Sequence, residues 1–277
     1  MIIANVVMTR QAHNRADCSP WQDAAFEPAS GQDLSKLRAP ALHTMEKDTL
    51  LNQSFTDSRD TESTYHLFKH GIDTSKPVGA LIHLHGDGGD EYNFPEGFAT
   101  CAAAVAAEYN FITVVPRTPD KKSSTWWRNL RKNQRWLDDL TAQITSDFNV
   151  DKNQLWWSGY SGGAEFISYA LLHKRPELVT GGAIMLAGGG APSWENKHFE
   201  SEYRASTPLY WVVGEYDDGS TSQDGFDALG AAHRGSRWYR NEGFSNINLE
   251  VLPNYDHYNL PTIDVLQDTL RGLVGTS

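Results

Sequence analysis

The sequence predicts an α/β fold with a mostly parallel central sheet, helices on both faces and no large cap domain. Short apolar runs alternate with helical stretches along most of the chain, an order that produces parallel strands covered by helices. Two of these runs, residues 78–85 and 111–115, are apolar at successive positions, as strands buried on both faces are. Residues 188–207, which separate two of the later strands, are too few for a helical cap.

The first half of the chain is expected to form an edge hairpin and then a buried strand–helix–strand unit. Alternation at Tyr65 and Leu67 is typical of a strand with one exposed face. The spacing of Phe98, Cys101 and Val105 places these side chains on one face of a helix. In order, we expect strands at 49–55, 63–69 and 78–85, a helix at 96–109 and a strand at 111–115.

The second half is expected to add four strands and four helices after an irregular segment at 117–130. One helix is strongly amphipathic, with Leu137, Leu140 and Ile144 on a single face. In order, we expect a helix at 131–148, a strand ending near Gly159, a helix running past Leu172, strands at 182–187 and 209–213, a helix at 223–233, an alternating edge strand at 247–252 and a closing helix at 261–273.

The predicted domain spans residues 46–277 and follows an N-terminal extension. Residues 1–45 mix Pro, Ser, Asp, Gln and Ala without periodicity, so we expect this extension to be partly mobile. No internal repeat or low-complexity linker divides the rest, and 277 residues suffice for one α/β domain. No apolar run reaches 18 residues, so no membrane-spanning helix is expected.

The formal net charge of −11 argues against nucleic acid or an anionic membrane as a partner, because both select basic surfaces. Positive charge does gather locally. We expect this cluster to be a solvated helix face, with a binding strip as the alternative. Its members are Lys121, Lys122, Arg128, Arg131, Lys132 and Arg135. The sequence does not indicate an oligomeric state.

The chain has two cysteines, Cys18 and Cys101. Cys101 lies in an alanine-rich helix and is expected to be a small buried apolar side chain, which we favour over a bridge to Cys18. No cysteine spacing typical of a metal site is present, and no metal or cofactor is expected. The N-terminus lacks a basic segment and a small-residue cleavage site, so we expect a cytoplasmic protein. Secretion is the alternative if the start omits a signal peptide.

The segment Gly159-Tyr160-Ser161-Gly162-Gly163 has the pattern Gly-x-Ser-x-Gly, with a predicted strand before it and a predicted helix after it. In such a turn the serine adopts a strained conformation that exposes its hydroxyl. The flanking glycines allow neighbouring backbone to approach closely. Ser161 is therefore the candidate nucleophile.

A serine hydroxyl needs a base within hydrogen-bond reach, and we expect that base directly after a strand. Among ten histidines, His257 follows the last strand and occupies a loop. His83 and His85 share one face of a strand and are expected to be structural. His173 and His233 are assigned to helix ends, where a cation suits the helix dipole.

The base in turn needs an acid that fixes its tautomer, and the strand at 209–213 is followed by acidic residues. Asp217 is our choice, with Asp218 as the rival. Asp256 is a weaker candidate, because neighbouring residues in an extended loop point apart. Asp217 and Asp218 could instead cap the turn ahead of the next helix.

An oxyanion intermediate requires two donors aimed at it. The predicted donors are the backbone N–H groups of Gly162, within the turn, and Asp87, in the loop His85-Gly-Asp-Gly-Gly. A phosphate cradle is the alternative for this loop. It lacks both the Gly-Lys-Ser/Thr of a P-loop and the complete dinucleotide pattern.

With these residues in place, the chain resembles the α/β-hydrolase superfamily, and within it the esterases related to polyhydroxybutyrate depolymerases and to feruloyl and acetyl-xylan esterases. The resemblance covers roughly residues 63–270. It implies a serine esterase with the triad Ser161, Asp217 and His257. The matching pieces are His85-Gly-Asp-Gly-Gly, Trp126-Trp127, the run from Asp138 to Leu155 ahead of Gly-Tyr-Ser-Gly-Gly, the Gly-x-x-Asp after the strand at 209–213, and the late His257.

Without a cap, the site should be shallow, open and rimmed by aromatic side chains. Trp126, Trp127 and Trp194 are the candidates for this rim, and Tyr160 is a further substrate-binding candidate. An open aromatic rim suits short-acyl or aromatic esters on bulky or polymeric substrates better than a buried fatty acyl chain. The alternatives are a serine peptidase or acyltransferase on the same fold, or a binding protein without catalytic activity.

Overall fold

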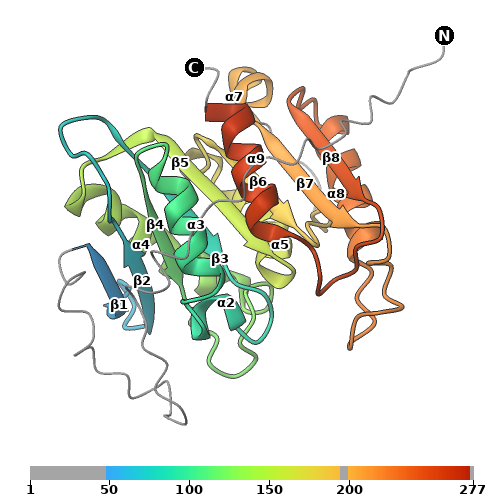
Figure 1. The fold of residues 1–277 in the computed structure, drawn as a ribbon, viewed down its shortest axis with the longest axis horizontal. Coiled ribbons are helices and arrows are strands. Elements are labelled where there is room, and N and C mark those ends of the chain that lie inside the picture. Colours follow the sequence, from blue (N-terminus) through green and yellow to red (C-terminus); the bar gives the residue numbers. More distant parts are fainter. Residues whose placement is uncertain (1–47, 194–198, 275–277) are drawn as a thin grey trace.

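The computed structural model describes residues 48–193 and 199–274. The predicted extension at 1–45, and with it Cys18, lies outside the described residues, as does Trp194. Within the described ranges the chain forms one eight-stranded sheet with helices packed on it (Figure 1).

The sheet has the strand order β1-β2-β4-β3-β5-β6-β7-β8. β1 and β2 pair antiparallel, as do β2 and β4, whereas every pairing from β4 to β8 is parallel. The predicted mostly parallel sheet is therefore confirmed. The strands are β1 (Thr49–Thr56), β2 (Glu62–Phe68), β3 (Val78–Leu84), β4 (Phe111–Pro116), β5 (Val150–Tyr160), β6 (Gly182–Leu186), β7 (Leu209–Gly214) and β8 (Ile247–Leu252).

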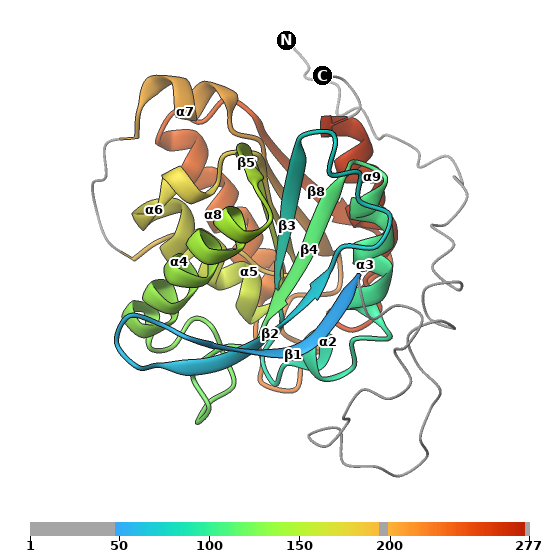
Figure 2. The ribbon, with the colours of Figure 1, turned by 90° about the vertical axis from the view of Figure 1, so that its left-hand side faces the viewer.

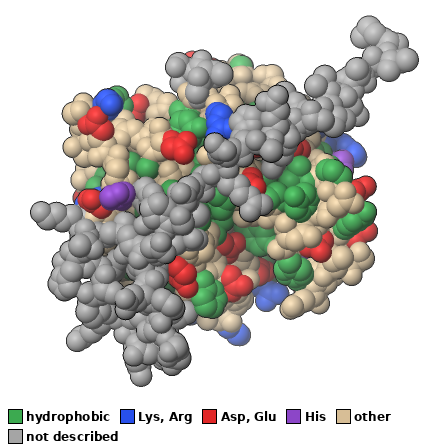
Figure 3. Space-filling view, in the orientation of Figure 1, with side chains coloured by type: hydrophobic (Ala, Val, Ile, Leu, Met, Phe, Trp, Pro, Cys, Tyr) green, Lys and Arg blue, Asp and Glu red, His purple; other side chains and the backbone are tan. Residues whose placement is uncertain are grey.

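Helices cover both faces of the sheet, as the alternating sequence predicts. Figure 2 shows α3 (Phe98–Ala107) and α9 (Thr262–Val274) on one face. It shows α4 (Leu130–Asp147), α6 (Leu172–Lys174) and α8 (Ala228–Asn241) on the other. On the α3–α9 face, Lys and Arg side chains are scattered singly among acidic and apolar ones (Figure 3).

The strand β5 lies at the centre of the sheet between β3 and β6, and its successive side chains point to opposite faces. Trp156 packs into the cluster beneath α3 and α9. Leu155 and Trp157 pack into the cluster beneath α4 and α8. Because both faces of β5 are buried, its carboxyl end is held firmly at the middle of the sheet edge.

Several helix boundaries differ from the sequence prediction. The predicted helix at 223–233 instead begins at Ala228, because Asp227 caps it by accepting the N–H of Gly230 at 2.7 Å. His233 consequently lies inside α8, so its assignment to a helix end is wrong. The helix after the Gly-x-Ser-x-Gly turn is α5 (Gly162–Phe166) followed by a π-helical turn at Ile167–Leu171 and by α6.

Two short helices were not predicted. α2 (Asp90–Asn93) follows the glycine-rich loop, and α7 (Ser201–Ser206) lies in the connection between β6 and β7. Within the described part of that connection, α7 is the one helix, and its six residues form no cap domain. None of the described helices is long and apolar enough to cross a membrane.

Cys101 lies in α3 with 5% of its surface exposed, in agreement with its predicted burial. It is, however, bonded in a disulfide. The expectation of a small apolar thiol is therefore wrong. The periodicity of a helix reports which face is buried and carries no information on whether a buried thiol meets a second sulfur.

Candidate active site

Ser161 lies at the carboxyl end of β5, immediately before α5, and adopts φ 49° and ψ −114°. A non-glycine residue with positive φ is strained, and the surrounding structure must hold it in place. Here the Ser161 N–H donates to the Leu186 carbonyl at 2.9 Å, and the Ser161 carbonyl accepts the N–H of Glu165 at 3.0 Å. These two hydrogen bonds fix the turn from both sides.

The glycines around Ser161 are required by close backbone contacts. A Cβ on Gly163 would lie 2.1 Å from the Leu84 carbonyl oxygen. A Cβ on Gly159 would lie 2.6 Å from the carbonyl carbon of Gly163. Gly163 therefore lets the turn approach the end of β3, and Gly159 lets the end of β5 pack against the start of α5.

His257 follows β8 in a loop, and its imidazole contacts Ser161. The distance from His257 Nε2 to Ser161 Oγ is 3.0 Å. On the other side of the ring, Nδ1 lies 3.0 and 2.9 Å from the two carboxylate oxygens of Asp217. With a carboxylate there, Nδ1 carries the proton and donates it, which leaves Nε2 free to accept the serine hydroxyl.

Asp217 is completely buried, and burial raises the pKa of its carboxyl while the hydrogen bond from His257 opposes that rise. The rival acids have other roles in the structure. Asp218 is exposed and accepts the Ser220 N–H at 3.0 Å. Asp256 accepts the N–H groups of Tyr258 and Asn259, at 2.9 and 3.1 Å. Of the three acids considered, the structure therefore brings Asp217 to the imidazole.

The loops that carry the acid and the base are joined through their backbones. The Tyr216 N–H donates to the Tyr255 carbonyl at 2.9 Å. A Cβ on Gly214 would lie 2.2 Å from the same carbonyl oxygen, so the two loops pack without a side chain between them. This backbone contact holds the two loops side by side, so that Asp217 and His257 lie within hydrogen-bond distance.

The histidines His83 and His85 are buried and hydrogen-bonded, as structural histidines are. His83 Nδ1 lies 2.8 Å from Ser158 Oγ. His85 Nε2 accepts the N–H of Thr118 at 3.1 Å, so its Nδ1–H donates to the Gly86 carbonyl at 2.6 Å. Burial lowers the pKa of His83 to about 3 and that of His85 to about 4, so both are neutral at pH 7.

The two predicted oxyanion donors belong to segments that lie against each other. The Gly162 N–H begins α5 and has no partner within that helix. The Asp87 N–H donates to none of the described residues. A Cβ on Gly162 would lie 2.0 Å from Oδ1 of Asp87, which places the loop after β3 directly against the turn at Ser161.

Glu91 is a residue of this site that the sequence analysis missed. Its Oε2 accepts the N–H of Gly86 at 3.0 Å and so ties α2 to the start of the glycine-rich loop. Burial raises the pKa of Glu91 to about 7, while hydrogen bonds to backbone N–H groups and the charge of His257 act in the opposite direction. The position of Glu91 five residues after Gly86 was visible in the sequence, but the turn that brings them together was not.

The aromatic candidates divide into exposed and buried members. Trp126 is completely buried between His85 and Phe166, so its predicted place on the rim is wrong. Trp127 is partly exposed, and its indole N–H donates to the Asp87 carboxylate, at 2.9 Å from Oδ2 and 3.2 Å from Oδ1. Trp194 lies outside the described residues.

Tyr160 is partly buried, and its hydroxyl donates to the backbone carbonyl of His257. Its ring lies 5.3 Å from the imidazole ring. Tyr160 therefore holds the backbone of the His257 loop, whereas its predicted role was substrate binding. Among the described residues, no group of three or more His, Cys, Asp or Glu side chains could hold a metal ion.

No protein-family model and no curated protein sequence matches this chain. Solved structures do match it. A thermostable esterase aligns with a TM-score of 0.61 at 19% identity over 83% of this chain and 63% of that one. The carboxylesterase from Bacillus cereus aligns with a TM-score of 0.58 at 17% identity over 76% of this chain and 94% of that one.

A third match is a mutant of the feruloyl esterase module from Clostridium thermocellum complexed with sinapinate. It aligns with a TM-score of 0.57 at 11% identity over 82% of this chain and 89% of that one. Identities this low establish similarity of fold. Together with the strand order and the turn at Ser161, they show that this chain has the α/β-hydrolase fold.

Proposed function

We propose that the protein is a serine hydrolase that cleaves carboxylic esters through an acyl-enzyme intermediate. The observation that carries this proposal is the relay of contacts from Ser161 Oγ to His257 Nε2 at 3.0 Å and from His257 Nδ1 to the buried carboxylate of Asp217. A hydroxyl, an imidazole and a carboxylate in this order supply a nucleophile, a base and a group that holds the base.

In the acylation step, Ser161 Oγ attacks the ester carbonyl carbon while His257 Nε2 takes the hydroxyl proton. The carbonyl π electrons move onto oxygen, and the N–H groups of Gly162 and Asp87 stabilise the oxyanion. Collapse of this intermediate expels the alcohol, which receives the proton from His257. The Asp217 carboxylate stabilises the imidazolium while it exists and itself remains ionised.

In the deacylation step, a water molecule replaces the alcohol. His257 removes a proton from the water as its oxygen attacks the acyl carbon, and the same two N–H groups stabilise the second oxyanion. The intermediate then releases the carboxylic acid, and the proton returns from His257 to Ser161 Oγ. No cofactor or metal ion takes part in the proposed cycle.

The substrates that we propose are short-acyl or aromatic esters on bulky or polymeric carriers. Two features support this choice: the described part of the connection between β6 and β7 holds the six-residue α7, and the partly exposed Trp127 lies beside the turn at Ser161. An open site with an aromatic wall can admit a large alcohol portion while giving little cover to a long acyl chain.

A peptidase or an acyltransferase would use the same three side chains. A test against both compares matched ester and amide substrates and identifies their products, in water alone and in water with an added alcohol. We expect the free acid as the main product in either case. Amide cleavage faster than ester cleavage would favour a peptidase, and preferential formation of a new ester would favour a transferase.

The disulfide at Cys101 supports secretion over a cytoplasmic location, because disulfides persist in oxidising compartments. Alkylation of the denatured protein before and after reduction tests this point. We expect Cys101 to be modified only after reduction when the protein is isolated from its native compartment.

The experiment that tests the proposed reaction is labelling with a fluorophosphonate, which reacts with activated serine hydroxyls. The native protein should be labelled, and Ser161→Ala should not. Ser220→Ala is a matched control, because Ser220 is exposed and lies outside the relay. Absence of label on the native protein, or unchanged label on Ser161→Ala, would contradict the proposal.

A further inference from the structure

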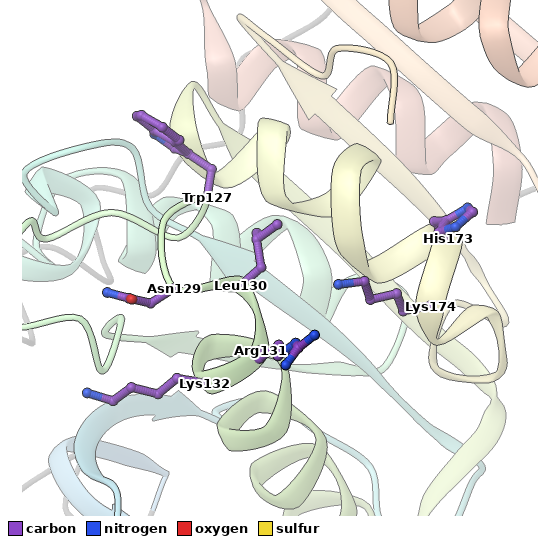
Figure 4. A pocket seen from close by; sticks show the side chains of 7 residues that line it. All are labelled: Trp127, Asn129, Leu130, Arg131, Lys132, His173 and Lys174. Atoms are coloured by element: carbon purple, nitrogen blue, oxygen red, sulfur yellow. The ribbon is translucent and has the colours of Figure 1, made fainter. Parts of the chain in front are cut away.

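A surface groove of about 930 Å³ lies between the first turn of α4 and the end of α6. Figure 4 shows its lining side chains, with Arg131 and Lys174 extending toward each other from the two elements. We call this feature the basic groove. It is lined by Trp127, Asn129, Leu130, Arg131, Lys132, His173 and Lys174.

The described lining of the basic groove contains three cations, a histidine and no acidic side chain. This composition is unusual for a chain with a net charge of −11. The first turn of α4 adds positive potential of its own, because the helix dipole has its positive end there. The positive end of the dipole repels nearby cations in the free protein, and a bound anion would offset that repulsion.

Two arginines of α4, Arg131 in the basic groove and Arg135 outside it, differ in their contacts. Arg135, one turn further along α4, pairs with the buried Asp57 at 2.9 Å. Arg131 makes no ion pair with any described residue. Burial lowers the pKa of the Lys174 ammonium, and the nearby charge of Arg131 lowers it further. Two cations that repel each other across a groove create a place for an anion between them.

Trp127 connects the basic groove to the proposed catalytic residues. Trp127 is among the residues that line the groove, and its indole N–H donates to the carboxylate of Asp87. The Cδ1 atom of the same ring lies 3.1 Å from where a Cβ on Gly162 would be. The groove therefore begins at the side chain that touches both loops of the proposed oxyanion site.

We propose that the basic groove binds carboxylate groups of an acidic carbohydrate whose ester is hydrolysed at Ser161. This inference rests on the proposed esterase function and names the carrier of the ester. The groove's volume exceeds what one acyl group needs, and its cations suit carboxylates. The partly exposed Trp127 side chain offers apolar surface for a sugar beside the Arg128 guanidinium, which lies over its ring at 4.8 Å from the centroid.

An anionic lipid surface is the competing source of negative charge. Binding to a membrane requires protruding apolar side chains beside the cations. The large apolar side chains that are most exposed in the described part of the chain are Phe94, Tyr216, Val251 and Tyr258, and none of them lines the basic groove. The hollow shape of the groove, and the absence of these four side chains from its described lining, favour an acidic carbohydrate over a membrane.

The test compares two acetylated oligosaccharides of equal length, one of galacturonic acid and one of neutral xylose. We expect the native protein to hydrolyse the acidic ester with a KM about tenfold lower, and this advantage should shrink as salt is added. Arg131→Gln together with Lys174→Gln should lower kcat/KM about tenfold more for the acidic than for the neutral substrate. Arg237→Gln, an exposed arginine on α8 outside the groove, should change neither value.

A binding measurement separates this proposal from the proposed reaction. Unesterified trigalacturonate should bind to Ser161→Ala protein in calorimetry, and the double variant at positions 131 and 174 should weaken that binding in the same background. Trigalacturonate binding without any ester hydrolysis would support the groove proposal and overturn the proposed esterase function. Hydrolysis of 4-nitrophenyl acetate without trigalacturonate binding, or tighter binding to phosphatidylglycerol vesicles, would overturn the groove proposal.

Discussion

The loops around Ser161 and the basic groove meet at Trp127 but are built in opposite ways. In the loops, backbone contacts and buried hydrogen bonds fix each polar side chain, so that Asp217 and the His257 imidazole have defined partners. In the groove, Arg131 and Lys174 are brought near each other with like charge. The first region is held in one geometry, whereas the second brings like charges together, and we propose that an anionic ligand binds there.

This difference predicts that substitutions in the two regions have different consequences. Removing a group from the loops breaks a contact that the fold has already made. Removing Arg131 from the groove breaks no ion pair among the described residues. The following predictions test that distinction, from the largest expected effect to the smallest.

Asp217→Asn should lower kcat for ester hydrolysis by about 10³–10⁴-fold, because the amide cannot hold the His257 tautomer that accepts the serine proton. Asp218→Asn is the matched control, since Asp218 is exposed and caps a turn. It should leave kcat within about twofold of the native value. Steady-state kinetics on 4-nitrophenyl acetate measures both. Equal losses in the two variants would contradict the assignment of Asp217.

Gly163→Ala should destabilise the protein by about 3–5 kcal/mol, because its Cβ would lie 2.1 Å from the Leu84 carbonyl oxygen and the backbone would have to move. Gly272→Ala, in α9, meets no atom within 4 Å and should be neutral or stabilising by up to about 1 kcal/mol. Urea unfolding followed by circular dichroism measures both changes. A small loss at Gly163 would mean that the turn adapts more easily than its contacts indicate.

Glu91→Gln should make stability less dependent on pH. The folded protein raises the pKa of Glu91 from 4.5 to about 7, so it holds the proton more tightly than the unfolded chain does. The native protein therefore loses stability as the pH rises from about 4.5 through 7. Glutamine cannot ionise and retains an oxygen for the Gly86 N–H.

We expect Glu91→Gln to be more stable than the native protein by up to about 3 kcal/mol at pH 8 and similar to it at pH 4. Denaturant unfolding at the two pH values gives the comparison. Glu96→Gln is the control, because Glu96 lies in the same connection between β3 and β4. An equal change in stability at pH 4 and pH 8 would show that ionisation of Glu91 does not destabilise the folded protein.

The smallest expected effect is the difference in stability between substitutions of two arginines of α4. Arg135→Gln should cost about 1 kcal/mol, because it leaves the buried Asp57 carboxylate without its cation. Arg131→Gln should change stability by less than about 0.5 kcal/mol, since it breaks no ion pair among the described residues. Chemical denaturation of both variants at low salt makes the comparison. A larger loss of stability in Arg131→Gln would show that Arg131 stabilises the fold.

Much of the proposed site could be located from the sequence, because its residues follow strands. The carboxyl ends of parallel strands share one edge of a sheet, so Ser161, Asp217 and His257 could be expected near each other from the order of the strands alone. The Gly-x-Ser-x-Gly pattern also implied close backbone packing, and the contacts of Gly159 and Gly163 agree with it.

Other features depended on contacts that no local pattern encodes. Trp126 and Trp127 are adjacent and identical in type, yet the first is buried and the second lines the basic groove. Arg131 and Arg135 belong to one cluster in the sequence, but only Arg135 meets Asp57, 78 residues earlier in the chain. The disulfide at Cys101 and the hydrogen bond of Glu91 escaped prediction for the same reason.

The sequence by itself determined the order of strands and helices, the burial of the central strands and the strained turn at Ser161, because periodicity and glycine placement act over a few residues. The tertiary structure alone decided which acid faces His257, which tryptophan remains partly exposed and which arginine of α4 pairs with Asp57. The reason is distance along the chain, because His257 lies 40 residues from Asp217 and 96 from Ser161, and Arg135 lies 78 from Asp57. Such side chains meet only when the sheet has formed.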